Sequence, residues 1–187
     1  MQIEIKRDCE LSLAERRCLE QMFVPLFAQE TGAVDDTGVA EGVGEIEWDK
    51  IEWAGIDWHV FLWEGEEMVS HVEIIDRIGT VGGRSIRLGG IGGVATRPSW
   101  RGHGFAAAAM QKAAEFMREE LRVDFGLLIC DQQTQPFYRR LGWQSVQGPL
   151  VFDQPARRVT FTDVVMVLAC RQSDWPVGVI DLCGLPW

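Results

Sequence analysis

The pattern of hydrophobic and polar positions predicts a chain that mixes strands with a few helices. Residues 2–6 alternate in polarity as a short strand does. Ser12 begins a helical pattern that continues to Phe27, and Glu15 completes a capping box three residues after Ser12. Glycines and acidic residues dominate 31–55, which predicts a long loop or lid containing a short helix.

The middle of the chain predicts two successive hairpins. Residues 58–64 and 67–76 read as strands joined at Gly65. A second turn at 80–84 leads into a returning strand that continues to Thr96.

The rest of the chain predicts two helices and three strands. The helices cover residues 102–121 and 134–141, the second closed by Gly142. Residues 124–130 form an apolar run of the kind that is buried on both faces of a sheet. Two further strands are expected within 143–152 and 162–170, and we expect the tail at 175–187 to dock on the domain.

Length and composition favour one intracellular domain. A chain of 187 residues that is 47% hydrophobic can fill one core, so we expect a single domain over residues 1–187. Five cysteines at irregular spacings fit neither a disulfide framework nor a zinc site, which predicts reduced thiols and a cytoplasmic location. The N-terminus lacks the pattern of a signal peptide, and no apolar run reaches the roughly 20 residues of a membrane helix.

The charge is strongly acidic and unevenly distributed. A net charge of −10 argues against nucleic acid as a partner, because phosphates attract basic patches. Ten acidic residues lie between Glu30 and Glu67, against the single lysine Lys50. This stretch is either a solvated acidic face or a rim that attracts a cationic substrate.

Residues 88–106 contain the clearest candidate for a binding site. They pass from a strand through a glycine turn into an alanine-rich helix. Gly102 and Gly104 lack the Cβ atoms that would hold an anion away from the backbone, and the helix N-terminus presents N–H groups without intrahelical partners. With Arg101 as an added cation, this segment predicts a cradle for a diphosphate.

Two motifs give the chain a resemblance to a known superfamily. The segment from Arg101 to Ala106 matches the Q/R-x-x-G-x-G/A signature of the GNAT acyl-CoA-dependent N-acyltransferases. The segment from Pro136 to Trp143 resembles the second motif of that superfamily, F-Y-x-x-x-G-F/W. Over most of its length the chain is similar to the aminoglycoside 2'-N-acetyltransferases, and residues 174–181 also resemble the end of nodulation protein A.

The resemblance implies an α+β fold and an acetyl-CoA donor. The expected fold is a GNAT-like mixed, mostly antiparallel sheet of about seven strands, flanked by helices. It splays where the strand ending at Thr96 meets the strand ending at Cys130. The resemblance implies donor contacts from Val94, Ala95, Thr96, Arg101, Gly102, His103, Gly104, Phe105 and Ala106. No metal is expected, because the three histidines show no metal-ligand spacing.

Tyr138 is the candidate general acid. It is the only tyrosine and lies in the second motif, and its ordinary pKa of about 10 suits it to protonate a departing thiolate. The alternative is a tyrosine that only packs against the donor. Cys130 lies near the same place, but a covalent cysteine mechanism lacks a histidine partner nearby in the sequence.

The general base is missing where the resemblance implies it. A glutamate is expected on the central strand at the position that Gly92 occupies. The remaining candidates, for catalysis or acceptor binding, are the C-terminal carboxylate of Trp187, Asp131 and Asp181. Four tryptophans either stack on a sugar acceptor or serve as ordinary packing residues, namely Trp48, Trp53, Trp58 and Trp63.

The expected activity is acetyl transfer from acetyl-CoA to a primary amine of a small cationic acceptor, an aminoglycoside-like amino sugar, by direct attack. A backbone N–H near Val94 or Ala95 would hold the oxyanion. The expected partner is a small amine without nucleic acid or membrane, and a homodimer is compatible with this reading. Two alternatives stay open: a non-catalytic acyl-CoA-binding or sensing domain, and a nodulation-type enzyme that transfers a longer acyl chain to an amino-sugar oligomer.

Overall fold

The computed structural model describes residues 1–30, 46 and 48–187. Three α-helices lie within these residues: α1 (Leu13–Glu30), α2 (Phe105–Glu119) and α3 (Gln135–Arg140). Three short 3-10 helices accompany them, η1 (Asp8–Glu10), η2 (Trp48–Lys50) and η3 (Pro98–Trp100), and η2 is the short helix expected within 31–55. The strands are β1 (Gln2–Arg7), β2 (Trp58–Glu64), β3 (Glu67–Val81), β4 (Arg84–Thr96), β5 (Phe125–Cys130), β6 (Gln144–Ser145), β7 (Leu150–Gln154), β8 (Arg157–Phe161), β9 (Val164–Ala169) and β10 (Ile180–Asp181). None of these helices combines the length and hydropathy needed to cross a bilayer.

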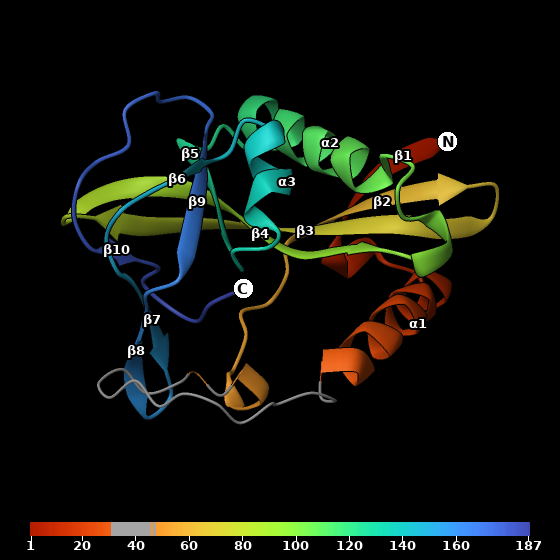
Figure 1. Ribbon diagram of the computed structural model, residues 1–187, viewed down its shortest axis with the longest axis horizontal. Coiled ribbons are helices and arrows are strands. Elements are labelled where there is room, and N and C mark those ends of the chain that lie inside the picture. Colours follow the sequence, from red (N-terminus) through yellow and green to blue (C-terminus); the bar gives the residue numbers. More distant parts are fainter. Residues whose placement is uncertain (31–45, 47) are drawn as a thin grey trace.

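All ten strands belong to one mixed sheet (Figure 1). Its order is β6-β9-β5-β4-β3-β10-β7-β8, with β2 also on β3 and β1 on β2. The long strand β3 therefore pairs with β4 along one edge, and with β2 and then β10 along the other. Only the pairs β4–β5 and β7–β10 are parallel, which confirms the expected mixed, mostly antiparallel sheet.

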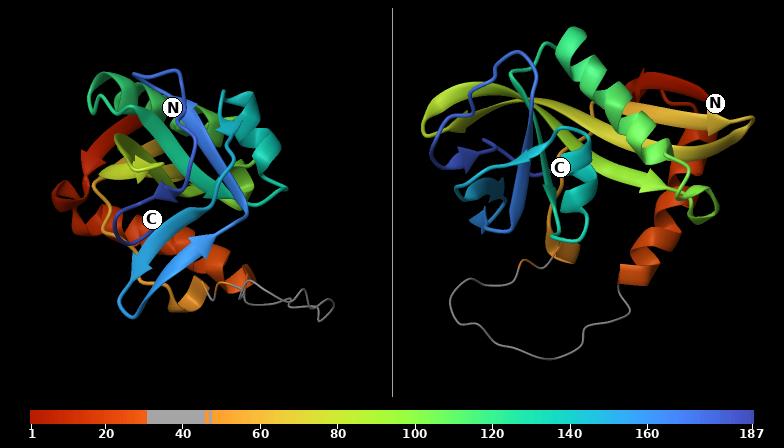
Figure 2. Two further views of the ribbon diagram at one scale, coloured as in Figure 1. Left: turned by 90° about the vertical axis from the view of Figure 1, so that its left-hand side faces the viewer. Right: turned by 45° about the horizontal axis from the view of Figure 1, so that its top comes forward.

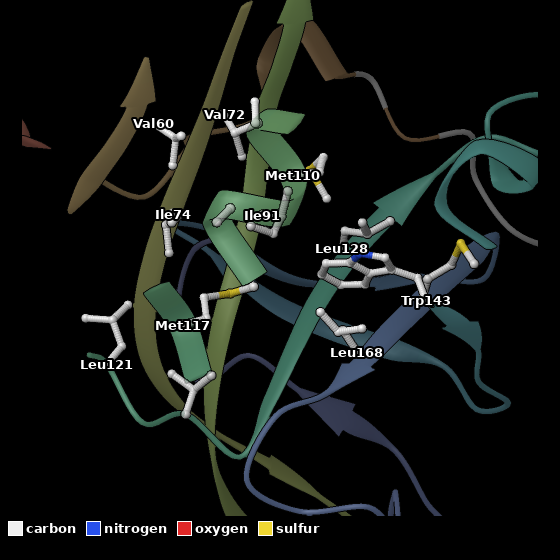
Figure 3. Close-up of a cluster of buried hydrophobic side chains, with 14 of the residues drawn as sticks. Val60, Val72, Ile74, Ile91, Met110, Met117, Leu121, Leu128, Trp143 and Leu168 are labelled. Carbon is white, nitrogen blue, oxygen red and sulfur yellow. The ribbon is translucent and has the colours of Figure 1, made fainter. Parts of the chain in front are cut away.

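Helices cover both faces of the sheet (Figures 1 and 2). On one face α2 lies across β2, β3 and β4, and its apolar side meets the core drawn in Figure 3. Met117 of α2 packs against β4 at Gly89, where a Cβ atom would lie only 2.4 Å from the methionine sulfur. On the opposite face α1 packs over Phe61, Met68 and Ala95.

Strands β4 and β5 separate after a short paired stretch. Their parallel pairing covers only Leu88–Gly90 against Phe125–Leu127. Beyond that point β5 keeps β9 as its partner and β4 keeps β3, so the two inner edges diverge. The register of β3 and β4 also shifts where Val72 faces both Gly93 and Val94, and Gly93 has a φ of 52°. This β-bulge leaves main-chain groups out of the regular ladder beside the opening.

Several sequence predictions are confirmed with changed boundaries. The capping box of Ser12 and Glu15 is present at the start of α1. The strand expected within 162–170 is confirmed as β9. The single strand expected within 143–152 was wrong, because these residues contain β6 and the start of β7, and β8 was not predicted. The ten strands exceed the seven expected, because short segments with little periodicity became strands through tertiary pairing.

The second strand of the first hairpin is also longer than the predicted 67–76. Strand β3 continues unbroken from Glu67 to Val81 and so takes part in both hairpins, with turns at Gly65 and at Gly82–Gly83. All five cysteines are free thiols.

The packing of Trp187 on β4 gives a stability prediction. A Cβ atom at Gly90 would lie 2.1 Å from Trp187 Cε2, so Gly90→Ala must displace the indole ring. We expect Gly90→Ala to lower the free energy of unfolding by about 1–3 kcal/mol in urea denaturation, as overpacking does. Gly55→Ala is the control, because no atom lies within 4 Å of its added methyl group. Equal stability of the two variants would contradict the packing of Trp187 on β4.

Candidate active site

A pocket of about 410 Å³ opens where β4 leads into α2. Its lining comes from the end of β4, the glycine turn, the start of α2, and α3. The residues are Thr96, Trp100, Arg101, Gly102, Gly104, Phe105, Ala106, Ala107, Phe137, Arg140 and Leu141. Six predicted donor contacts are therefore brought together, and α3 adds a second cation, Arg140, that the sequence analysis did not assign.

The glycines of this pocket are required by backbone conformation. Gly102 and Gly104 have φ values of 78° and 83°, in the region that side chains rarely adopt. A Cβ atom at either position would meet no other atom within 4 Å, so the space above the turn is open. Gly104 is also the N-cap of α2 and offers no side chain to the first-turn N–H groups. The turn can therefore present these donors to an anion.

Three other predicted donor contacts are absent from the pocket lining. The Ala95 side chain is buried toward α1, and Val94 packs against the core under α2. Any contact from these two residues must come from the main chain at the bulge. His103 is exposed, and its Nδ1 lies 2.9 Å from the Arg101 carbonyl oxygen, so its ring supports the turn.

Tyr138 lies on α3 beside the open end of β5. Its ring packs against Phe137 and Trp143, with centroid distances of 5.0 and 6.5 Å. Burial, with smaller contributions from Cys130 and Asp131, raises the pKa of Tyr138 to about 12. The phenol therefore keeps its proton at any physiological pH. Burial likewise raises the pKa of the Cys130 thiol, which disfavours its use as a thiolate nucleophile.

A carboxyl group lies at the place where the sequence lacked one, and it comes from the neighbouring strand. Glu73 of β3 pairs directly with Gly92 of β4. A Cβ atom at Gly93 would lie 2.4 Å from Glu73 Cδ, so the carboxyl group sits over the bulge in space left by the glycine. Sequence reasoning missed Glu73 because it looked along β4. The available signal was the run of glycines, which predicts that something from a neighbouring strand lies close.

The surroundings of Glu73 shift its acidity strongly. Burial, and to a smaller extent the negative charge of Asp8, raises the pKa of Glu73 from 4.5 to about 7. The group is therefore divided between its acid and its base at neutral pH. That is the condition under which a carboxylate works best as a general base.

Two buried histidines lie next to Glu73 on the same face of the sheet. His59 of β2 pairs with Glu73 in register, and His59 Nδ1 lies 2.9 Å from His71 Nε2. One nitrogen of each ring and a carboxylate oxygen of Glu73 lie within 4.8 Å of one another, close enough to share a cation. Two imidazole nitrogens on one tetrahedral zinc ion would lie about 3.3 Å apart. The 2.9 Å separation is instead that of a hydrogen bond.

The other candidates from the sequence are distributed unevenly. The C-terminal carboxylate of Trp187 lies beside the site, because a Cβ atom at Gly92 would be 3.4 Å from Glu73 Oε2 and 3.6 Å from the carbon of that carboxylate. Asp131 lies in the turn before α3, where it accepts hydrogen bonds from the Thr134 backbone N–H and hydroxyl. Asp181 is paired with Arg158. It also lies opposite Thr80, about 23 Å along β3 from Glu73 at the usual strand rise.

The tryptophans fall into two groups. Trp58 packs on Phe116 under the Arg7 guanidinium, and Trp63 packs beside Phe61, so both are packing residues of the sheet. Trp48 and Trp53 instead form an exposed stacked pair with ring centroids 5.8 Å apart. Five acids of the proposed rim lie outside the described residues: Asp35, Asp36, Glu41, Glu45 and Glu47.

A family model described as an acetyltransferase (GNAT) domain matches residues 35–146, more than half of the chain. The protein belongs to the GNAT acetyltransferases. This membership confirms the family and the acyl-CoA-dependent N-acetyltransferase class that the two motifs indicated.

Solved GNAT structures share this fold at low sequence identity. Escherichia coli ElaA matches 89% of this chain and 98% of its own, with a TM-score of 0.60 and 18% identity. A GNAT family acetyltransferase from Brucella melitensis, solved with acetyl-CoA, matches 96% of this chain and 94% of its own, with a TM-score of 0.59 and 14% identity. At such identities the likeness concerns the fold alone.

One curated relative carries a more specific name. An aminoglycoside 2'-N-acetyltransferase from Mycolicibacterium fortuitum is 29% identical over 98 residues. The match covers 52% of this chain and 49% of the relative, so the GNAT acetyltransferase described here spans about half the length of that protein.

The raised pKa of Glu73 predicts a pH-dependent cost to stability. Ionising Glu73 is harder in the folded chain, where its pKa is about 7, than at the ordinary value of 4.5. The penalty is therefore absent below pH 4.5, grows as the pH rises, and is complete above pH 7. We expect Glu73→Gln to raise the free energy of unfolding by roughly 2–3 kcal/mol at alkaline pH, with no gain in acid.

Urea denaturation at several pH values measures this effect. Glu67→Gln is the matched control, because Glu67 lies on the same strand but is exposed and only 3.7 Å from Arg97. An exposed ion pair contributes about 0–1 kcal/mol, so this control should change little. A pH-independent effect of Glu73→Gln would contradict the buried, strained ionisation of Glu73.

Proposed function

We propose that this GNAT acetyltransferase transfers an acetyl group from acetyl-CoA to a primary amine of a small cationic acceptor by direct attack. The observation that carries the proposal is the position of the Glu73 carboxyl group. Glu73 belongs to β3, but its carboxyl group lies over the bulge of β4, and β4 leads into the anion cradle. A base and an anion site are thus joined by one short strand segment. The single domain over residues 1–187 is part of this proposal.

The cradle fits the diphosphate of coenzyme A. Its left-handed glycines, the open space above them and the uncapped start of α2 offer backbone donors to phosphate oxygens. Arg101 and Arg140 add positive charge to the same pocket. The thioester of acetyl-CoA supplies the acetyl group, and the relative from Brucella was solved with that donor.

Glu73 acts as the general base in this mechanism. A primary ammonium must lose a proton before its nitrogen can attack, and a carboxyl group with a pKa of about 7 accepts that proton near neutral pH. Holding the amine beside Glu73 supplies the proximity that lowers the barrier further.

The main chain and Tyr138 complete the reaction. At the bulge, Gly93 and Val94 lie outside the regular pairing. The N–H group of Val94 or of the adjacent Ala95 is proposed to donate to the thioester oxygen as negative charge develops there. Tyr138, whose raised pKa keeps it protonated, is proposed to donate its proton to the departing thiolate.

The proposed acceptor is an aminoglycoside-like amino sugar. Two observations support it: the Glu73 carboxyl group at the bulge, which can receive an amine, and the name of the Mycolicibacterium relative. We propose that Trp187 lines the acceptor site, because its main chain lies beside Glu73. Asp131 and Asp181 already have structural partners, so we give neither a part in the mechanism.

The non-catalytic alternative rested on the missing base at Gly92. Glu73 places a carboxyl group opposite that position, which removes the observation that favoured a silent domain. Release of CoA from acetyl-CoA, measured with aminoglycosides, polyamines and glucosamine oligomers, tests the proposal directly. Tight binding of acetyl-CoA with no release for any acceptor would favour the silent domain. Release only with longer acyl donors would favour the nodulation-type alternative.

Replacing Glu73 should lower kcat and also remove the fall of kcat at acidic pH. We expect Glu73→Gln to lower kcat by about 10²–10⁴-fold, the usual contribution of a general base. In the unsubstituted enzyme kcat should fall as the pH drops below about 7, because Glu73 becomes protonated. Steady-state rates across pH measure both effects, with Glu67→Gln as control. A residual acid limb in Glu73→Gln would assign the base to another group.

Replacement of the acid should separate turnover from binding. We expect Tyr138→Phe to lower kcat by about 10²-fold, with little change in the dissociation constant of acetyl-CoA. Phe137→Ala should do the reverse, because Phe137 lines the donor pocket while Tyr138 does not. Calorimetric titration and steady-state kinetics on both variants make the comparison. Unchanged turnover in Tyr138→Phe would leave that residue a packing role only.

A further inference from the structure

Two tryptophan side chains stack on one another at the surface near the C-terminus. The ring centroids of Trp48 and Trp53 lie 5.8 Å apart, with an angle of 17° between the ring planes. The two residues remain 39% and 46% exposed, whereas tryptophan is highly buried on average. Packing of the core therefore does not account for this pair.

The backbone that carries the pair is held by the β7–β8 hairpin. The Gln154 side chain of β7 accepts a hydrogen bond from the Glu52 N–H and donates one to the Glu52 carbonyl oxygen, each 2.9 Å long. Trp48, in η2, meets the edge of Phe161 of β8 with ring centroids 5.9 Å apart. Ile51 is buried in the cluster that includes this hairpin. The two indoles are thus presented in a fixed arrangement, which lowers the entropy cost of binding a ligand on them.

A hydrogen bond places Trp53 next to the C-terminal residue. The N–H of Ala54, which follows Trp53, donates to the carbonyl oxygen of Pro186 at 2.7 Å. Pro186 directly precedes Trp187, whose carboxylate lies beside the Glu73 carboxyl group. Trp53 is therefore one hydrogen bond away from the residue that lines the proposed acceptor site.

The tryptophan pair and Glu73 are on the same side of the sheet. Figures 1 and 2 show η2 on the side where α1 lies. His71 shares a face of β3 with Glu73, and its ring contacts Phe23 of α1 with centroids 5.5 Å apart. An acceptor bound at Glu73 can therefore extend along this side toward the pair.

The faces of the two indoles suit a cation. An ammonium group within about 6 Å of a tryptophan ring centroid is attracted by the negative face of the ring. The exposed charges of the segment are mixed, because Glu52 and Lys50 both face water. The aromatic faces are therefore the feature that selects a cationic group here. Amino sugars of the proposed acceptor class carry several ammonium groups, and only one of them reacts.

We propose that Trp48 and Trp53 form a subsite for a second ammonium group of the acceptor, on a ring other than the one that carries the reacting amine. This inference rests on the proposed function. It narrows the acceptor to an amino sugar that bears amines on more than one ring, and it makes Trp53 a specificity-determining residue.

Steady-state kinetics with acetyl-CoA and two acceptors test the subsite. Tobramycin carries amines on more than one ring, whereas glucosamine carries a single amine. We expect Trp53→Leu to raise the KM for tobramycin by about tenfold, with kcat and the KM for acetyl-CoA unchanged, because the cation loses an aromatic face. The KM for glucosamine should stay the same, since its single amine is held at Glu73.

Two further variants separate recognition from folding. Trp53→Phe keeps an aromatic face and should recover most of the affinity for tobramycin. Ile78→Ala is the matched control, because Ile78 is also an exposed hydrophobic residue but lies outside this segment. An unchanged KM for tobramycin in Trp53→Leu would overturn the subsite. An equal rise in KM for both acceptors would also overturn it and would indicate displacement of Trp187.

Calorimetric titration with tobramycin in the presence of CoA does not depend on turnover. Binding that is about tenfold weaker in Trp53→Leu, without acetyl transfer by the unsubstituted protein, would support the subsite and reject the proposed function. Acetyl transfer with equal dissociation constants in the two proteins would reject the subsite alone. Absence of tobramycin binding to the unsubstituted protein would overturn the subsite.

Discussion

The separation of β4 from β5 is the constraint on which the site depends. The two strands share hydrogen bonds over three residue pairs, and each then stays with its outer partner. The freed end of β4 carries the bulge at Gly93 and leads directly into the left-handed turn before α2. Backbone donors for an anion and displaced main-chain groups for a thioester thus follow from the course of one strand.

Three titratable side chains on the sheet face opposite α2 complete the candidate site. Glu73, His59 and His71 project from neighbouring strands into a space that glycines on β4 leave open. Burial lowers the pKa of both histidines and keeps them neutral, whereas it raises the pKa of Glu73 to about 7, so Glu73 is the group that exchanges a proton near neutral pH. The same burial makes ionised Glu73 costly to stability, an arrangement common where a residue is kept for function.

The fold and half of the site could be predicted from local sequence. The anion cradle depends on consecutive residues, because Gly102 and Gly104 set a turn whose geometry is local. Tyr138 was identified in the same way, from a short motif on one helix. The short strands β6 and β10 could not be predicted, because two-residue strands have no periodicity and exist only through their partners. The grouping of His59, His71 and Glu73 on the neighbouring strands β2 and β3 likewise has no signature along the chain.

The sequence by itself determined the family, the glycine turn that is the candidate donor site and the candidate acid, since each depends on residues that are neighbours in the chain. Only the tertiary structure revealed Glu73, the proposed base. Along β4, Gly92 stands where a glutamate was expected, but antiparallel pairing brings Glu73 of β3 opposite it. Because Gly92 and Gly93 have no side chains, there is room for the Glu73 carboxyl group. The physical reason is strand register, which no single segment encodes: it sets a carboxyl group of β3 at the position where the resemblance implied one on β4.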